Sequence, residues 1–142
     1  MAEQDLIKLA RENVEAFSAG DWRRFSAPLA PDAVYNELAT GRRIQGPDQI
    51  VQVTRAWKEA FPDAKGRVTN AIASGNTVAQ EITWEGTQNG PLQGPSGTIP
   101  ASGRRAVVPA VQVLTFEGDK IKENRHYFDM MGMLQQLGVA PE

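Results

Sequence analysis

Hydrophobic residues recur at helical spacing in the first half of the chain. Leu6, Ala10, Val14 and Phe17 form one apolar stripe, which predicts a helix over residues 5–18 that ends at Gly20. Asp21 is a favoured N-cap and begins a short second helix, which Pro31 and Asp32 end. Residues 33–38 then read as a short strand. Gly46-Pro47-Asp48 begins a third helix that Pro62 stops.

The period changes from helical to alternating at Lys65, which predicts a hairpin over residues 65–84 with its turn at Gly75-Asn76. Residues 89–103 hold four glycines and three prolines and predict a long irregular loop, either a pocket cover or simple surface. A second hairpin, residues 104–129, turns at Gly118-Asp119. The apolar run 130–137 predicts a closing helix.

The turn at Gly118-Asp119 sets an expected register for the second hairpin. Counting back from it pairs Phe116 with Ile121 and Gln112 with Arg125. Because a strand sends alternate side chains to opposite faces, one face collects Glu123, Arg125, Tyr127 and Asp129, and His126 points to the other face with Asn124 and Phe128. Charged groups on a face that leads to an apolar helix suggest a polar-lined cavity, although a solvated face of mutually offsetting charges is the simpler alternative.

Helices followed by strands indicate an α+β fold with helices on one face of an antiparallel sheet of four to six strands. The 142 residues fit a single domain, 1–142, and 41% hydrophobic with 23% charged residues is ordinary globular composition. The formal charge of −2 comes without a basic run, so we expect no nucleic-acid partner. No segment resembles a signal peptide or a membrane span, which favours a cytoplasmic protein without a membrane partner.

The absence of cysteine and the single histidine exclude thiol chemistry and a multi-histidine metal site. Phosphate-cradle, dinucleotide and nucleophile-elbow patterns are also missing. We therefore expect neither a metal nor another cofactor.

Several short motifs together resemble the SnoaL-like polyketide cyclase and ester cyclase family. They are Gly46-Pro47-Asp48, Phe61-Pro62-Asp63, Gly86-Thr87-Gln88, Gly118 to Glu123, and Asp129 followed by Leu134-Gln135-Gln136-Leu137-Gly138. The resemblance runs from about Val14 to Gly138. It implies the cone-shaped fold of nuclear transport factor 2, with three to four helices on the concave side of a curved sheet, and a homodimer.

The resemblance also implies that Asp129 is the acid/base of an intramolecular aldol closure. The alternative is an N-cap of the closing helix. Tyr127 and Arg125 would assist, as a donor to an oxyanion and as a positive charge beside an enolate. The alternative for Arg125 is an ion pair with Glu123 or Asp129. This chain has Gln88 and Tyr127 where relatives often have histidine, so the reaction can differ from theirs.

The expected substrate contacts are neutral amides, aromatic rings and one methionine. They are Gln88, Gln112, Trp84, Asn36, Trp57, Gln80 and Met133. Amides and an indole suit a bulky, oxygenated and mostly apolar ligand. Core packing is the simpler reading for Trp57, Trp84 and Met133. Asn36 lies where ketosteroid isomerases of this fold place their base, and Glu37 would face away.

The leading hypothesis is a cofactor-independent cyclase that closes a ring in a hydrophobic, polyketide-like carbonyl substrate by acid/base catalysis. An isomerase, a dehydratase or an epoxide hydrolase on the same fold is the second hypothesis. The epoxide hydrolase is disfavoured because the strand Gln80-Glu81-Ile82-Thr83 lacks an Arg-x-Asp. The third is a non-catalytic module that binds a small ligand or dimerises.

Overall fold

A computed structural model of the chain describes residues 2–94 and 97–139. Its helices are α1 (Glu3–Ala19), α2 (Trp22–Ser26), α3 (Pro47–Ala60) and α4 (Met130–Gln136). Its strands are β1 (Leu29–Glu37), β2 (Arg42–Gln45), β3 (Lys65–Ser74), β4 (Thr77–Thr87), β5 (Leu92–Gly94), β6 (Gly97–Ile99), β7 (Arg105–Glu117) and β8 (Lys120–Phe128). The predicted helices are therefore confirmed, except that the second one ends at Ser26 and not at Pro31, which belongs to β1. Strand β2 was not predicted.

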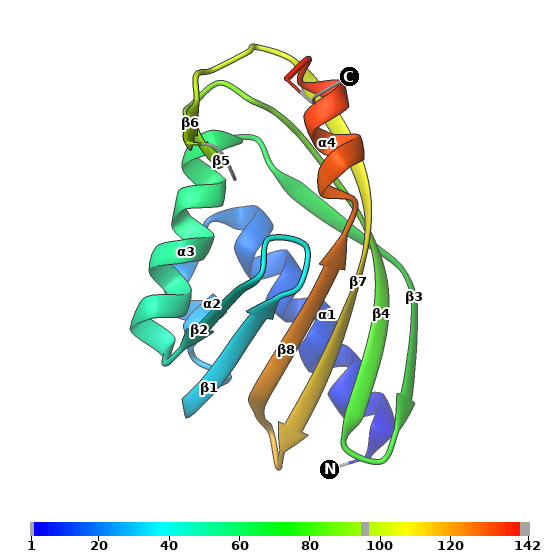
Figure 1. Cartoon of the computed structure of the whole chain (residues 1–142). Coiled ribbons are helices and arrows are strands. Elements are labelled where there is room, and N and C mark those ends of the chain that lie inside the picture. The colour runs from blue at the N-terminus through cyan, green and yellow to red at the C-terminus, as the bar shows by residue number, and fades with distance from the viewer. Residues whose placement is uncertain (1, 95–96, 140–142) are drawn as a thin grey trace.

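Six strands form one curved sheet in the order β2-β1-β8-β7-β4-β3 (Figure 1). All neighbours are antiparallel except β1 and β8, which run parallel. The prediction of a wholly antiparallel sheet is thus wrong at this one pair. The parallel pair arises because the chain crosses after β2 through α3 to the opposite edge of the sheet. It then adds β3, β4, β7 and β8 in turn, until β8 lies beside β1.

The helices cover the inner, concave face of the sheet, which confirms the α+β class (Figure 1). Helix α1 packs on β3 and β4, α3 packs on β1 and β2, and α4 packs on β7. Because α1 and α3 each bury one apolar stripe against the sheet, the core gathers between the layers around Phe17, Phe25, Leu114, Phe116 and Ile121. Among the described residues, no helix is both long and apolar enough to span a bilayer.

The register of β7 against β8 differs from the prediction by one residue beyond the turn. Phe116 pairs with Ile121 as expected, but Thr115 then pairs with Glu123, so β8 carries a one-residue bulge at Lys122. Gln112 consequently lies opposite His126 and not opposite Arg125. Since one inserted residue exchanges the two faces of a strand, every prediction about the inner face of β8 beyond this bulge is reversed.

The glycine- and proline-rich segment is more regular than predicted. Strands β5 and β6 form a small two-stranded ribbon within residues 89–103, of which residues 95–96 lie outside the described part. Gln88 is fully buried and holds this segment through Nε2, which donates to the carbonyls of Gly90, Ile99 and Pro100. The role of the segment as a pocket cover stays a prediction.

Candidate functional site

A cavity of about 120 Å³ lies between the inner face of the sheet and the helices. Its wall is mostly apolar and rich in aromatic rings, namely Phe17, Phe25, Trp57, Phe61, Trp84 and Phe128. Seven polar residues also line it, namely Asn13, Tyr35, Thr54, Glu85, Gln112, Asn124 and His126. Few polar groups in an apolar cavity are typical of a small-molecule site.

The polar side chains form a row across the sheet. In register, Glu37 on β1 lies beside His126 on β8, His126 beside Gln112 on β7, and Gln112 beside Gln80 on β4. All four are buried. Four buried polar residues at one level of a mostly apolar face cost stability unless their polar groups have hydrogen-bond partners, which indicates that this row is a built site.

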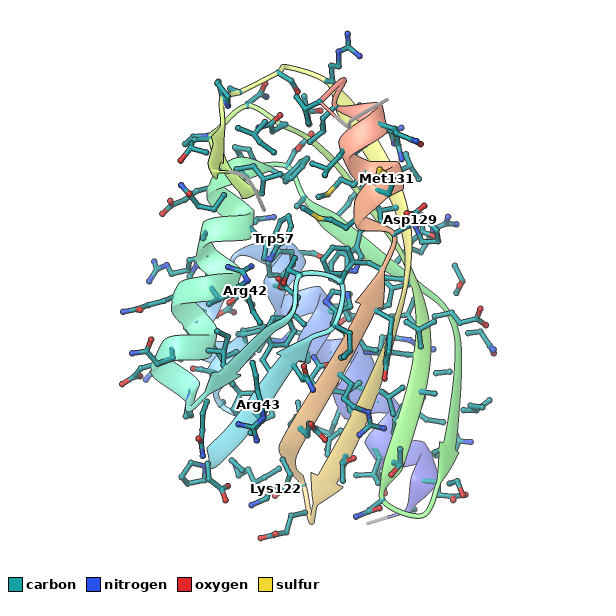
Figure 2. All side chains as sticks on the ribbon, viewed as in Figure 1. Arg42, Arg43, Trp57, Lys122, Asp129 and Met131 are labelled. Carbon is teal, nitrogen blue, oxygen red and sulfur yellow. The ribbon has the colours of Figure 1, made fainter. Side chains whose placement is uncertain are left out.

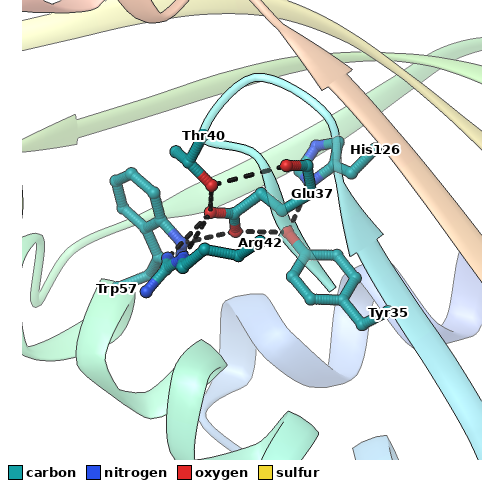
Figure 3. Close-up of polar contacts among 6 residues, drawn as sticks. All are labelled: Tyr35, Glu37, Thr40, Arg42, Trp57 and His126. Atoms are coloured by element: carbon teal, nitrogen blue, oxygen red, sulfur yellow. Dashed lines mark hydrogen bonds and ion pairs between the residues drawn. The ribbon is translucent and has the colours of Figure 1, made fainter. Parts of the chain in front are cut away.

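Glu37 is the anchor of this row and is wholly inaccessible to solvent (Figure 3). Its Oε1 accepts hydrogen bonds from Arg42 Nε at 3.0 Å and Nη2 at 2.7 Å, and from Thr40 Oγ1. Its Oε2 accepts from Trp57 Nε1 at 2.9 Å and from the Tyr35 hydroxyl at 2.8 Å. Burial alone would raise the pKa of Glu37, but these hydrogen bonds and the Arg42 charge outweigh burial and lower it, so the carboxylate is ionised.

His126 is connected to Glu37 through Tyr35, whose hydroxyl oxygen lies 2.8 Å from His126 Nδ1 (Figure 3). On its other side, His126 Nε2 accepts the indole N–H of Trp84 at 3.1 Å. Burial lowers the pKa of His126 to about 4, against the opposing charge of Glu37, so the imidazole is neutral at pH 7. Burial and the Glu37 charge raise the pKa of Tyr35 well above its usual value.

The two ends of this chain fix the direction of its hydrogen bonds. An indole nitrogen can only donate, so His126 Nε2 must be the acceptor and the proton of the neutral ring sits on Nδ1. An ionised carboxylate can only accept, so Tyr35 donates to Glu37 and receives from Nδ1. The unprotonated nitrogen of His126 is therefore the one beside Trp84.

Trp84 is held in place by close packing on both of its sides. Its ring meets Phe17 edge to face at 5.3 Å and lies on Gly66, its cross-strand partner. A Cβ atom at Gly66 would come within 2.5 Å of the indole ring. Glycine at this position is therefore what lets the indole N–H reach His126.

The residues predicted to be catalytic lie elsewhere. Arg125 and Tyr127 do not line the cavity: they lie on the outer face of β8, where Tyr127 is 45% exposed. Arg125 forms the ion pair with Glu123 that was its alternative reading, at 3.1 Å. The expectation that these residues share a cavity wall is wrong, because it assumed a strand without the bulge at Lys122.

Asp129 is exposed at the junction of β8 and α4 and is not part of the cavity lining (Figure 2). It is the N-cap of α4, and its Oδ1 accepts the backbone N–H of Gly132 at 2.8 Å. The capping alternative is thus present in the structure. A catalytic role for Asp129 stays a prediction.

The predicted substrate contacts divide into two groups. Trp57, Trp84, Gln112 and Met133 line the cavity. Gln80 is buried behind Gln112, Gln88 binds the loop backbone, and Asn36 shares the outer face with Arg125, its cross-strand partner.

Sequence reasoning missed the centre of the site, because it turned Glu37 and His126 away from the cavity. Polarity would predict an exposed Glu37 and a buried Leu38, but Glu37 lies inside and Leu38 is 42% exposed. On β8 a signal was available: Ile121 and Phe128 are both apolar but lie an odd number of residues apart. A regular strand would place them on opposite faces, so this pair is compatible with a bulge between them but does not require one.

Comparison with known proteins agrees with this architecture. The family model described as SnoaL-like polyketide cyclase matches residues 7–137, so the chain belongs to this family. No curated protein is similar enough to match. Within the described residues, no cluster of three or more histidine or carboxylate side chains could hold a metal ion.

Solved structures show the same fold. A candidate SnoaL-like polyketide cyclase from Jannaschia superposes with a TM-score of 0.87 at 20% identity, covering 98% of this chain and 95% of that one. IdmH from Streptomyces antibioticus, a candidate polyketide cyclase, gives a TM-score of 0.80 at 25% identity over 94% and 99%. An LEH-like epoxide hydrolase from M. tuberculosis gives 0.74 at 20% over 95% and 90%. The nuclear transport factor 2-like fold, shared with ketosteroid-isomerase-like proteins, is confirmed.

Proposed function

We propose that this SnoaL-like protein is a cofactor-independent enzyme that closes a ring in a carbonyl substrate by an aldol-type reaction inside the cavity. The observation that carries the proposal is the pair formed by His126 Nε2 and Trp84 Nε1–H, 3.1 Å apart in the cavity wall. It places a base beside a hydrogen-bond donor. These are the two groups that enolisation of a carbonyl compound needs.

The proposed reaction moves one proton. A carbonyl oxygen of the ligand accepts the hydrogen bond of the Trp84 indole N–H in place of His126 Nε2, which leaves the lone pair of that nitrogen free. His126 then removes a proton from the carbon beside that carbonyl, and Trp84 stabilises the enolate oxygen. The enolate carbon bonds to a second carbonyl carbon of the same molecule, and His126 returns the proton to the new alkoxide oxygen.

Tyr35 and Glu37 stabilise the intermediate charge on His126. A protonated imidazole buried among aromatic rings is unfavourable without a counter-charge. Tyr35 connects Nδ1–H to the ionised Glu37, so the positive charge is balanced through one hydroxyl group. Arg42 holds the glutamate ionised and does not line the cavity.

A small 1,5-diketone, 2,6-heptanedione, tests the proposal, because its ring closure to 3-hydroxy-3-methylcyclohexanone is followed directly by NMR. We expect the protein to accelerate closure and His126→Gln to lower the rate at least about 100-fold, the usual contribution of a general base. Tyr127→Phe, a change at the adjacent outer-face residue, is the matched control and should keep the rate within about twofold. No acceleration, or an equal rate in His126→Gln, would contradict the proposal.

The same assay decides between His126 and Asp129. Asn caps a helix as well as Asp does, so Asp129→Asn preserves α4 and removes only the ionisable group. We expect it to keep the rate within about threefold. A loss of most turnover in this variant would return the acid/base role to Asp129.

An isomerase is the second candidate, because a single base beside a single donor is also sufficient to shift a double bond. Product analysis separates the two, since an isomerase forms no new carbon–carbon bond. The homodimer and the cytoplasmic location stay predictions. Light scattering at high protein concentration checks the former.

A further inference from the structure

Gln112 has a fixed amide orientation that follows from its neighbour. Gln80 is fully buried, and its Nε2 donates both to the carbonyl oxygen of Ala10 at 3.2 Å and to Gln112 Oε1 at 3.0 Å. A backbone carbonyl can only accept, so the nitrogen of Gln80 must lie at this end of its amide. Gln112 therefore has to present its oxygen to Gln80, and the direction of its amide is set by α1.

The nitrogen of Gln112 is left for another partner. Within the described part of the chain, Gln112 makes one side-chain hydrogen bond, and in that bond it is the acceptor. It lines the cavity and is 6% exposed. An amide nitrogen in a cavity wall whose N–H groups are unused is a ready donor to a ligand oxygen.

Gln112 is also next to the proposed base. It is the cross-strand neighbour of His126 on β7, whereas Trp84 reaches His126 from β4. The base therefore has two neutral N–H donors close to it, one from an indole and one from an amide. A ligand with a single carbonyl group needs only one of them.

We propose that Gln112 is a specificity-determining residue that binds a second oxygen of the ligand, so that the site prefers compounds with two carbonyl groups flanking the carbon that loses its proton. This inference rests on the proposed function, since it assigns the second donor of the same site.

The chemistry of such a ligand fits His126. Burial makes His126 a weak base, with a pKa of about 4, and a weak base removes a proton faster from a more acidic carbon. A carbon between two carbonyl groups is acidic because the negative charge of its enolate is shared by two oxygens. Each oxygen would then have its own N–H donor, from Trp84 and from Gln112.

Two phenyl ketones that differ in one carbonyl group provide the test: 1-phenyl-1,3-butanedione and 1-phenyl-1-butanone. Binding is measured by NMR titration of the indole N–H signals of Trp57 and Trp84, at pH 6 so that the diketone stays neutral. One neutral hydrogen bond corresponds to about fivefold in affinity, so we expect the protein to bind the diketone about fivefold more tightly. Gln112→Met, which keeps the size of the side chain, should abolish this preference and leave the affinity for the monoketone unchanged.

Two further variants keep the result interpretable. Gln52→Met makes the same change at an exposed position of α3 and should retain the full preference. Gln80→Met removes the group that orients Gln112 and should reduce the preference, even if Gln112→Met does not fold. If the wild type, Gln112→Met and Gln80→Met all preferred the diketone to the same extent, or if the wild type showed no preference, the inference would be overturned. The proposed function would not be affected by that result. Failure of both ketones to bind the wild type would overturn the proposed function as well.

Discussion

Both faces of β8 carry polar side chains, but one face is buried and the other is partly exposed to solvent. On the inner face, His126 is buried and belongs to a continuous chain from Trp84 to Glu37. On the outer face, Arg125 and Tyr127 are partly exposed, and the ion-pair partner of Arg125 is Glu123, two residues before it on the same strand. Residue type alone does not distinguish a proton-handling centre from an ordinary surface. Burial and connection to fixed partners do.

The strongest test of this comparison removes one glutamate from each face of the sheet, Glu37 on β1 and Glu123 on β8. Glu37→Ala leaves Arg42, Trp57 and Tyr35 without their shared acceptor in a buried place, and we expect the free energy of unfolding to fall by about 3–5 kcal/mol. Glu123→Ala removes half of a partly exposed ion pair and should cost less than about 1 kcal/mol. Urea unfolding of both variants measures the difference. Equal losses would show that the inner network contributes no more than the surface.

The packing of Trp84 on Gly66 provides a second test of the inner face. In Gly66→Ala the new methyl group would lie 2.5 Å from the indole ring and 2.8 Å from Val14, so something must move. Overpacking of this kind costs about 1–3 kcal/mol. We also expect the indole N–H signal of Trp84 to shift as its bond to His126 lengthens. A variant with an unchanged Trp84 signal would show that Gly66 does not position this donor.

The pH dependence of stability tests whether His126 is buried as a neutral group. Its pKa is about 4 in the fold and 6.5 when unfolded, so between these values the unfolded chain binds more protons and stability falls as pH falls. From pH 7 to pH 5 the expected loss is about 2 kcal/mol. Because the chain has a single histidine, His126→Gln should remove most of this slope between pH 7 and pH 5. Below about pH 4.5, protonation of Glu37 adds a separate loss, because the pKa of that carboxylate is lowered in the fold.

The smallest expected effect is at the junction of β8 and α4. Asp129→Ala removes the N-cap of α4 and should cost about 1 kcal/mol, whereas Asp129→Asn should cost almost nothing. Thermal unfolding of the two variants checks this. If Asp129→Asn were as destabilising as Asp129→Ala, the carboxylate would have a structural role beyond capping.

Much of the fold could be predicted from the sequence because its signals are local. The stripe of Leu6, Ala10 and Val14, the Gly-Pro-Asp before α3 and the turn at Gly118-Asp119 depend on spacing and backbone preference within a few residues. The edge strand β2 was missed because its four residues follow a short turn and carry two arginines. Four of the expected substrate contacts also lie in the cavity. Trp84 and Gln112 are on strands, where a side chain has only two faces to choose from, and Trp57 and Met133 are on the helices α3 and α4, where apolar side chains pack inward.

By itself, the sequence determined the helices, the hairpins and the family. Only the tertiary structure decided which alternate side chains of β8 face the cavity, because the bulge at Lys122 exchanges the two faces of the strand. The same holds for Glu37, whose burial depends on Arg42 and Trp57 arriving from two other elements to compensate its charge. Periodicity is a property of one segment, whereas the cost of burying a polar group is set by partners that are distant in sequence.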